Sequence, residues 1–270
     1  MNKLIVSTLA VVISLVAVQS TRAAISFTGS YSQDFNSLIT SGTGQPWAND
    51  STLSGWSLFQ GGGTSITTYS AGSGANSTGN FFSFGTGTAT DRSLGGTASG
   101  GAYFGSPAAG AVAGYITVAL QNTSGNTFGG FTISYTGEQW RDGGAATPVS
   151  QTMVLEYGFG STFAAVTTWT AAGSAFNFTS PVFVNTGSGV TVDGNVAGQV
   201  TGLGGTISSL TWNNLDTLWI RAIEKNDAGN DHSLAIDNFS ITATAVPEPA
   251  TVALASLGGL ACLVAMRRKR

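Results

Sequence analysis

Between residues 24 and 246, short runs of β-branched and aromatic residues alternate with clusters of Gly, Ser, Thr and Asn. Such runs predict strands, because branched and aromatic side chains suit a pleated surface and small polar residues supply the turns. No stretch of this part keeps the 3.6-residue apolar spacing of a helix. The predicted strands occupy residues 25–28, 55–59, 65–69, 81–84, 102–104, 113–120, 130–136, 152–157, 165–169, 181–185, 207–212, 217–224 and 233–243.

About a dozen strands are too many for one simple sheet, so we predict an all-β fold, a jelly-roll-like sandwich of two packed sheets. No internal repeat is visible, which disfavours a propeller or a solenoid. The glycine-rich stretches 61–63 and 85–98 are predicted to be exposed, mobile loops.

The two last predicted strands carry charged residues among apolar ones. In strand 217–224, alternation places Arg221 on one face with Trp219 and Ile223, and both faces are largely apolar, so we predict a central strand. In strand 233–243, alternation places Asp237 on the same face as Phe239. A charge among apolar neighbours needs a partner, so Arg221 and Asp237 are each expected to have one.

Residues 1–23 have the features of a secretory signal peptide. Lys3 precedes an apolar run over residues 4–18, and small residues follow at Thr21 and Ala23, so cleavage after Ala23 is expected. An uncleaved signal anchor is the alternative. The domain between the two ends of the chain is then predicted to span residues 24–245.

The other end of the chain has three parts. Pro247, Glu248 and Pro249 end any preceding strand, because proline has no N–H for a ladder. Residues 250–266 carry no charge and, as a helix, extend about 25 Å, near the lower limit for a membrane span. A basic tail then fixes the cytoplasmic side and consists of Arg267, Arg268, Lys269 and Arg270. An ordinary C-terminal anchor is the alternative interpretation.

This three-part order over residues 246–270 resembles the PEP-CTERM sorting signal of exported bacterial proteins. The resemblance implies export through the Sec translocon, a temporary membrane tether through helix 250–266, and cleavage by an exosortase near Pro247-Glu248-Pro249. It further implies a final place at the cell surface or in the extracellular matrix, often in bacteria that make exopolysaccharide. Glu248 would be a recognition residue and not a catalytic one. Segments such as QDF, DRSLG and YTGEQWR also resemble other PEP-CTERM proteins, without implying an activity.

Charge narrows the choice of partners. Residues 24–246 contain twelve acidic and four basic side chains, a net charge of −8, because six of the ten Lys and Arg lie in the terminal segments. Nucleic acid and anionic lipid need a cationic surface, so neither is an expected partner of this domain. The single cysteine, Cys262, lies in the apolar run, so no disulfide within the chain is expected.

A tryptophan between charged residues is a candidate glycan site. Glu138, Trp140 and Arg141 combine a ring on which a sugar can stack with charged groups that bind hydroxyls. The alternative is that Trp140 packs in the core beside an Arg–acid pair.

Structural calcium is the one cofactor that we consider. The closing segment Ile236–Thr242 resembles that of lectin-like and carbohydrate-binding jelly rolls, and this resemblance implies a calcium held by Asp34, Asn36 and Asp237. Pairing of Asp237 with Arg141 or Arg221 is the favoured alternative. The acid-rich stretch 224–232 could also bind calcium, but Asn, Asp and Gly are the usual turn residues, so a hairpin turn is favoured.

No catalytic residues are predicted. His232 is the only histidine, no Gly-x-Ser-x-Gly motif precedes it, and we expect it in a loop. The favoured hypothesis is a non-catalytic matrix protein that binds extracellular polysaccharide. The alternatives are a glycan hydrolase using a Glu/Asp pair, with Glu138, Glu156 and Glu224 as candidates, and a calcium-stabilised adhesin.

Overall fold

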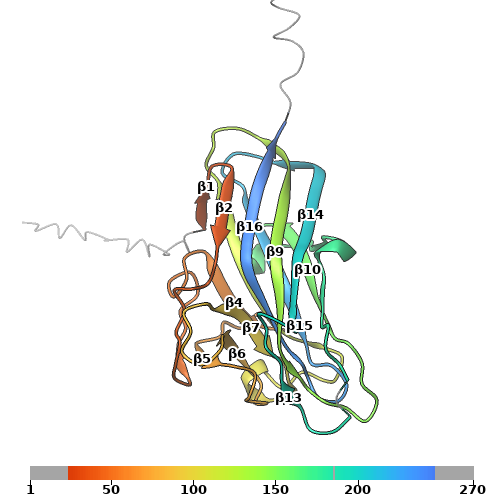
Figure 1. Cartoon of the computed structure of the whole chain (residues 1–270). Coiled ribbons are helices and arrows are strands. Elements are labelled where there is room, and N and C mark those ends of the chain that lie inside the picture. Colours follow the sequence, from red (N-terminus) through yellow and green to blue (C-terminus); the bar gives the residue numbers. More distant parts are fainter. Residues whose placement is uncertain (1–23, 185, 247–270) are drawn as a thin grey trace, which may run out of the picture.

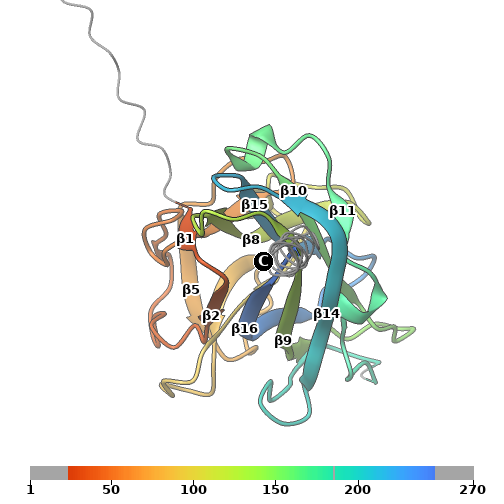
Figure 2. The ribbon, with the colours of Figure 1, turned by 90° about the horizontal axis from the view of Figure 1, so that it is seen from above.

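The computed structural model describes residues 24–184 and 186–246, which form two β-sheets (Figure 1). The first sheet has the strand order β1-β8-β15-β10-β11, with β4 also on β8 and β12 on β10. The second has the order β13-β9-β16-β7-β6-β5-β3, with β14 also on β9 and β2 on β16. Viewed from above, β8, β10 and β15 lie on one side of the molecule and β9 and β16 on the other (Figure 2).

The strands of the first sheet are β1 (Ile25–Phe27), β4 (Trp56–Gln60), β8 (Val112–Asn122), β10 (Thr152–Phe159), β11 (Thr170–Ala171), β12 (Phe178–Thr179) and β15 (Thr217–Lys225). Those of the second are β2 (Ser30–Gln33), β3 (Gln45–Pro46), β5 (Thr68–Gly72), β6 (Asn80–Phe84), β7 (Ser93–Thr97), β9 (Phe128–Asp142), β13 (Val190–Thr191), β14 (Gln199–Trp212) and β16 (Ser233–Ala245). Three short 3₁₀ helices are η1 (Ala102–Phe104), η2 (Phe163–Ala165) and η3 (Ser174–Phe176).

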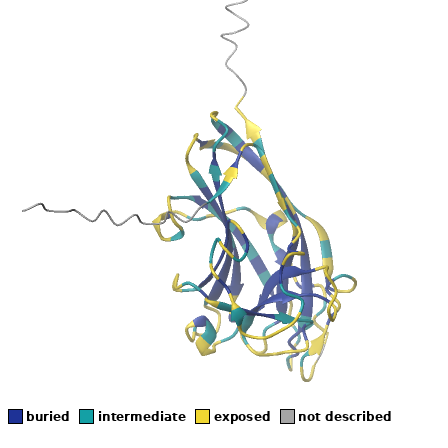
Figure 3. Ribbon diagram, turned by 90° about the vertical axis from the view of Figure 1, so that its left-hand side faces the viewer, coloured by how far each residue is buried: buried dark blue, intermediate teal, exposed yellow. Residues whose placement is uncertain are grey.

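The main core lies between the two sheets. Leu58, Ile116 and Ile220 of the first sheet pack in one buried cluster with Phe131 and Ile236 of the second. Buried residues follow the middle of the inner strands, whereas the connections and outer strands such as β14 carry many exposed residues (Figure 3). The predicted all-β sandwich of two sheets is therefore confirmed, and packing of apolar side chains holds it together.

Several strand predictions need correction. Residues 102–104 form η1 and not a strand, residues 165–169 contain only the last residue of η2 and no strand, and residues 181–184 form no strand. In the reverse direction, Ser93–Thr97 is a fully buried strand, β7, where an exposed loop was predicted. Gly95 explains the error: a Cβ there would collide with the Leu234 carbonyl of β16, so glycine lets the two strands meet, although a glycine-rich sequence is typical of a loop.

A bulge in β16 reverses the predicted side of Asp237. Asp237 pairs with Thr136 and Ser240 pairs with Ser134, so β16 has one more residue than β9 between these pairs. Asn238 takes up the extra residue with a left-handed φ of 48°. Phe239 and Ile241 consequently face the main core, whereas Asp237 follows Ala235, which packs with Trp140 on the outer face of the second sheet.

Candidate functional site

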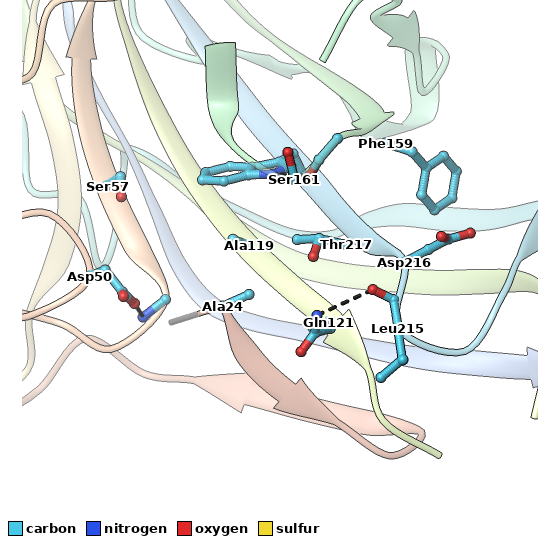
Figure 4. Close-up of a pocket in the computed structure, with 13 residues that line it drawn as sticks. Ala24, Asp50, Ser57, Ala119, Gln121, Phe159, Ser161, Leu215, Asp216 and Thr217 are labelled. Atoms are coloured by element: carbon cyan, nitrogen blue, oxygen red, sulfur yellow. Dashed lines mark hydrogen bonds between the residues drawn. The ribbon is translucent and has the colours of Figure 1, made fainter. Parts of the chain in front are cut away.

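The clearest candidate site is a groove of about 700 Å³ on the outer face of the first sheet (Figure 4). Small residues of β4 and β8 face outward here. Ser57 of β4 pairs with Thr117 of β8, and Ala119 of β8 pairs with Trp219 of β15. These small residues leave a depression beside the Trp219 ring. The groove is lined by Ala24, Asp50, Gly55, Ser57, Ala119, Gln121, Phe159, Gly160, Ser161, Leu215, Asp216, Thr217 and Trp219.

The groove lining combines aromatic rings with uncharged and acidic polar groups, and contains no Lys or Arg. The Gln121 amide donates to the Leu215 carbonyl at 3.2 Å, which fixes the side chain across the groove (Figure 4). Asp50 Oδ1 accepts a hydrogen bond from the Gly55 N–H at 2.7 Å, and Asp216 Oδ2 accepts one from the Asn213 N–H at 3.2 Å. Carboxylate and amide groups held this way keep further lone pairs and donors for a ligand.

One wall of the groove begins in residues 161–169, which fold back over the outer face of the first sheet. Gly158 and Gly160 make this possible, because a Cβ at either would collide with Val166. The Trp219 ring N–H donates to the Gly160 carbonyl at 2.9 Å and fixes the start of the segment. Its Phe163 ring stacks on Phe59 with a centroid distance of 4.3 Å. The segment is therefore anchored at three places.

Beyond this wall lies a second aromatic surface, built around Arg221. Its Nε and Nη2 atoms donate to Glu156 Oε2 at 2.8 and 2.5 Å. The guanidinium carbon lies 4.5 Å from the centre of the Tyr115 ring and 4.0 Å from that of the half-buried Trp169. The prediction that Arg221 needs an anionic partner is confirmed, and the partner is Glu156 of the neighbouring strand β10.

The structure places the predicted sugar platform inside the protein. Trp140 is 1% exposed and its ring stacks on Phe84 in a small cluster on the outer face of the second sheet. Its Nε1 donates to Ser93 Oγ at 2.9 Å and to Glu138 Oε2 at 3.1 Å, while Arg141 donates to the Gly74 carbonyl. Gly194, in a loop over the ring, has no side chain to keep the loop away, so Trp140 is covered and offers no face to a sugar.

Glu138 and Asp237 form a pair of buried carboxyls beside Trp140. Glu138 lies opposite Ala235, two positions along from the Thr136–Asp237 pair, so both carboxyls are on the same face. Burial raises the pKa of Glu138, and burial together with the nearby Glu138 raises the pKa of Asp237 to about 7. One oxygen of each, Glu138 Oε1 and Asp237 Oδ1, has no hydrogen-bond partner in the structure.

The expected pairing of Asp237 with an arginine is wrong. Arg221 belongs to the other sheet and binds Glu156, and Arg141 binds backbone carbonyls. Asp237 Oδ2 instead accepts a hydrogen bond from the Asn238 side chain at 2.7 Å.

The residues predicted to hold calcium are only partly brought together. Asp34 and Asp237 are close enough that Asp34 contributes to the raised pKa of Asp237, but the Asn36 side chain accepts from the Arg92 N–H. Within residues 24–184 and 186–246, no group of three or more His, Cys, Asp or Glu side chains is arranged to hold a metal ion. Calcium at Asp34, Asn36 and Asp237 stays a prediction.

The acid-rich stretch 224–232, at the end of β15 and after it, contains more buried titratable side chains than a surface turn would. Burial raises the pKa of Glu224 well above its usual range, and burial raises that of Asp231 to about 7. His232 lies in the connection before β16, as expected of a loop residue, but it is only 5% exposed, with Nδ1 3.0 Å from Ser180 Oγ and Nε2 3.4 Å from Asp142 Oδ1. Burial lowers the pKa of His232. The Ser180 side chain is itself buried, so a substrate cannot reach this Ser–His–Asp array.

Sequence reasoning therefore missed the groove and the surface around Trp169. Alternation along 217–224 did place Trp219 and Arg221 on one face, and the neighbouring Glu156 was visible as an acid in an apolar strand. What the sequence lacked was the strand order that puts β10 beside β15, and the fold-back of residues 161–169.

Residues 245–270 match the model of the PEP-CTERM protein-sorting motif. The chain carries this sorting signal. The match confirms the resemblance seen in the sequence and indicates an exported protein that an exosortase processes. The predicted signal peptide 1–23, the predicted helix 250–266 and the predicted recognition residues lie outside the described residues. In the described part, no helix has the length and apolar character needed to cross a membrane.

Solved structures similar to this chain include carbohydrate-binding modules. The CBM22-1 xylan-binding domain of Paenibacillus barcinonensis Xyn10C is 11% identical over 83% of this chain and 100% of that domain, with a TM-score of 0.36. The CBM22-1-CBM22-2 tandem of the same protein gives 11% identity, coverage of 84% and 49%, and a TM-score of 0.37. An arabinose-bound α-L-arabinofuranosidase is 12% identical over 80% of this chain and 26% of that chain, with a TM-score of 0.33. Likeness at these scores says nothing about a ligand, and comparison with curated proteins gives no match.

Proposed function

We propose that this chain is an exported, non-catalytic surface or matrix protein that binds extracellular polysaccharide in the groove on the outer face of its first sheet. The observation that carries the proposal is the lining of the groove, where the half-buried Phe159 and the 4% exposed Trp219 lie beside hydroxyl, amide and carboxylate groups, and where the described lining residues include no Lys or Arg. A sugar has C–H groups that pack on an aromatic ring and hydroxyls that need both donors and acceptors. The sorting signal supports the location, because it indicates export.

The location of the mature protein follows from the same signal. In this proposal, the Sec translocon exports the chain, helix 250–266 tethers it to the membrane, and an exosortase then cuts near Pro247-Glu248-Pro249. The domain reaches the cell surface or the matrix as a folded sandwich.

Affinity electrophoresis of the full chain in gels that contain a mixed-linkage β-glucan, a xylan or a dextran tests binding. We expect retardation by at least one of these polysaccharides. The double variant Gln121→Ala, Ser161→Ala removes two polar groups from the groove and should lose most of the retardation. The control Gln199→Ala, Ser208→Ala makes the same changes at exposed positions of β14 and should migrate like the unchanged protein. Equal migration of all proteins in every gel contradicts the proposal.

A second candidate, glycan hydrolysis, rests on one observation: Asp50 and Asp216 both line the groove, from opposite sides in Figure 4. Glycosidases use two carboxyl groups that flank the scissile bond. The earlier candidates Glu138 and Glu224 are buried away from the groove. Release of reducing sugar that disappears in both Asp50→Asn and Asp216→Asn would replace the binding proposal, whereas binding without release supports it.

A further inference from the structure

Trp169 has the setting of a ligand-stacking residue, although it lies outside the groove. One face of its ring is held against the Arg221 guanidinium at 4.0 Å, and Glu156 neutralises and fixes that guanidinium. Trp169 as a residue is half-buried. A ring that is already held by a cation–π contact loses little conformational entropy when a ligand packs on it.

The Trp169 ring and the groove lie close together on the same face. Phe163 lies between them, 5.4 Å from Trp169 and 5.9 Å from Trp219, measured between ring centroids. Trp169 and Trp219 therefore cannot be further apart than the sum of these two distances, which a short oligosaccharide spans. Trp219 lines the groove, so a chain bound there can continue over Phe163 to Trp169.

Charge on this face selects among glycans. Asp50 and Asp216 line the groove and Glu156 lies beside Trp169. Arg221 is already paired, Arg92 is buried and bound to Ser83, and Lys225 ends β15 at the opposite end from the groove. Arg141 donates to the carbonyls of Gly74 and Ala75. Among the described residues, an anionic glycan would meet carboxylates on this face with no unpaired Lys or Arg to offset them, whereas a neutral one meets hydrogen-bonding groups.

We propose that Trp169 is a second stacking surface for the glycan bound in the groove, that Arg221 and Glu156 position its ring, and that the ligand is a neutral polysaccharide chain. This inference rests on the proposed function, since it extends the same site. It adds to the site a further ligand-binding residue, a minimum length of the glycan and the charge of the glycan, none of which the groove alone gives.

The test compares long and short forms of one ligand. The full chain is titrated by calorimetry with whichever neutral polysaccharide retards it and with the disaccharide and hexasaccharide of that polymer. Trp169→Ala should weaken binding of the polysaccharide and hexasaccharide about tenfold, or ~1.4 kcal/mol, and leave the disaccharide unchanged. Trp169→Phe should restore most of the loss. The control Phe183→Ala removes an exposed ring outside this face and should change nothing.

Arg221→Lys tests the positioning role, because lysine has no planar group to stack between two rings. It should lower the ratio of hexasaccharide to disaccharide affinity, a readout that a general loss of folding does not change. An unchanged ratio contradicts positioning by Arg221. If the double variant Gln121→Ala, Ser161→Ala loses binding but Trp169→Ala keeps full affinity, this inference is overturned and the proposed function stands.

If the protein binds polygalacturonate, an anionic polymer, more tightly than any neutral polymer, the proposal that the ligand is neutral is overturned. Failure of the unchanged protein to bind any neutral polymer overturns both this inference and the proposed function.

Discussion

The outer faces of the two sheets both carry a tryptophan beside charged residues, but these residues are partly exposed on the first sheet and buried on the second. On the first, Trp169, Arg221 and Glu156 form a partly exposed stack in which each charge has its partner. On the second, Trp140 and Glu138 lie with Asp237 beneath loops, and no cation of the described part of the chain pairs with the two carboxyls. The comparison shows that a tryptophan beside charged residues becomes a surface or a core according to what covers it and where the arginine points. A carboxyl without a cation remains buried by keeping its proton.

The largest expected effect separates the two tryptophans. Trp140→Ala should lower the free energy of unfolding by about 3–5 kcal/mol, because it leaves a cavity and removes the donor to Glu138. Trp169→Ala should cost only about 1 kcal/mol, since it loses a cation–π contact at the surface. Urea denaturation measures both. Similar losses in the two variants would remove the distinction between the faces.

The next effect is the pH dependence of stability. The pKa of Asp237 is raised from 3.8 to about 7, so the folded state holds this proton more tightly than the unfolded chain does. Its contribution is therefore fully present below about pH 4 and is lost as the pH rises through about 7, a decline on the order of 3 kcal/mol. Glu138, Glu224 and Asp231 act in the same direction.

Denaturation at pH 5, 6.5 and 8 measures this decline. Asp237→Asn should flatten the profile, because the amide cannot ionise. Asp34→Asn removes the exposed carboxyl that contributes least to the raised pKa of Asp237 and should change the profile only slightly. Stability that increases with pH over this range in the unchanged protein is the result that contradicts buried, protonated carboxyls.

One substitution made on both faces should change stability in opposite directions. Glu156→Gln leaves the Arg221 guanidinium without its ion-pair partner and should destabilise by about 1–2 kcal/mol at pH 8. Glu138→Gln removes a carboxyl whose pKa is raised by burial and should stabilise by about 1 kcal/mol at pH 8, with a smaller effect at pH 5. Thermal melts at the two pH values detect the difference, and a loss of stability in both variants at pH 8 would refute it.

The smallest effect concerns the bulge that places Asp237 on the second face. Asn238 has a φ of 48°, which glycine adopts freely and alanine does not. Asn238→Gly should change stability by no more than a few tenths of a kcal/mol, and Asn238→Ala should cost about 1 kcal/mol. If alanine proves as stable as glycine, the left-handed conformation is not what fixes the bulge.

The site was less predictable than the fold, and particular residues show why. Alternation in 217–224 gave the faces of β15 correctly, since Trp219 and Arg221 lie on one side in an unbroken strand. The same rule failed for Asp237, because one residue added at Asn238 shifts every later side chain to the other face. Glycine-rich sequence was misleading as well. Residues 93–97 form a buried strand, although their glycines are typical of a loop. Gly158 and Gly160 let a segment pack over the sheet, which no local sequence pattern shows.

The sequence by itself determined what depends on neighbouring residues: the all-β class, the sorting signal at 245–270 and the acidic charge of the domain. These follow from composition and short patterns, which need no knowledge of what packs where. Only the tertiary structure decided that Trp140 is buried, that Arg221 meets Glu156, and that a groove opens beside Trp219. Each of these depends on residues distant in sequence, brought together by strand order and by loops that cover one face and leave the other open.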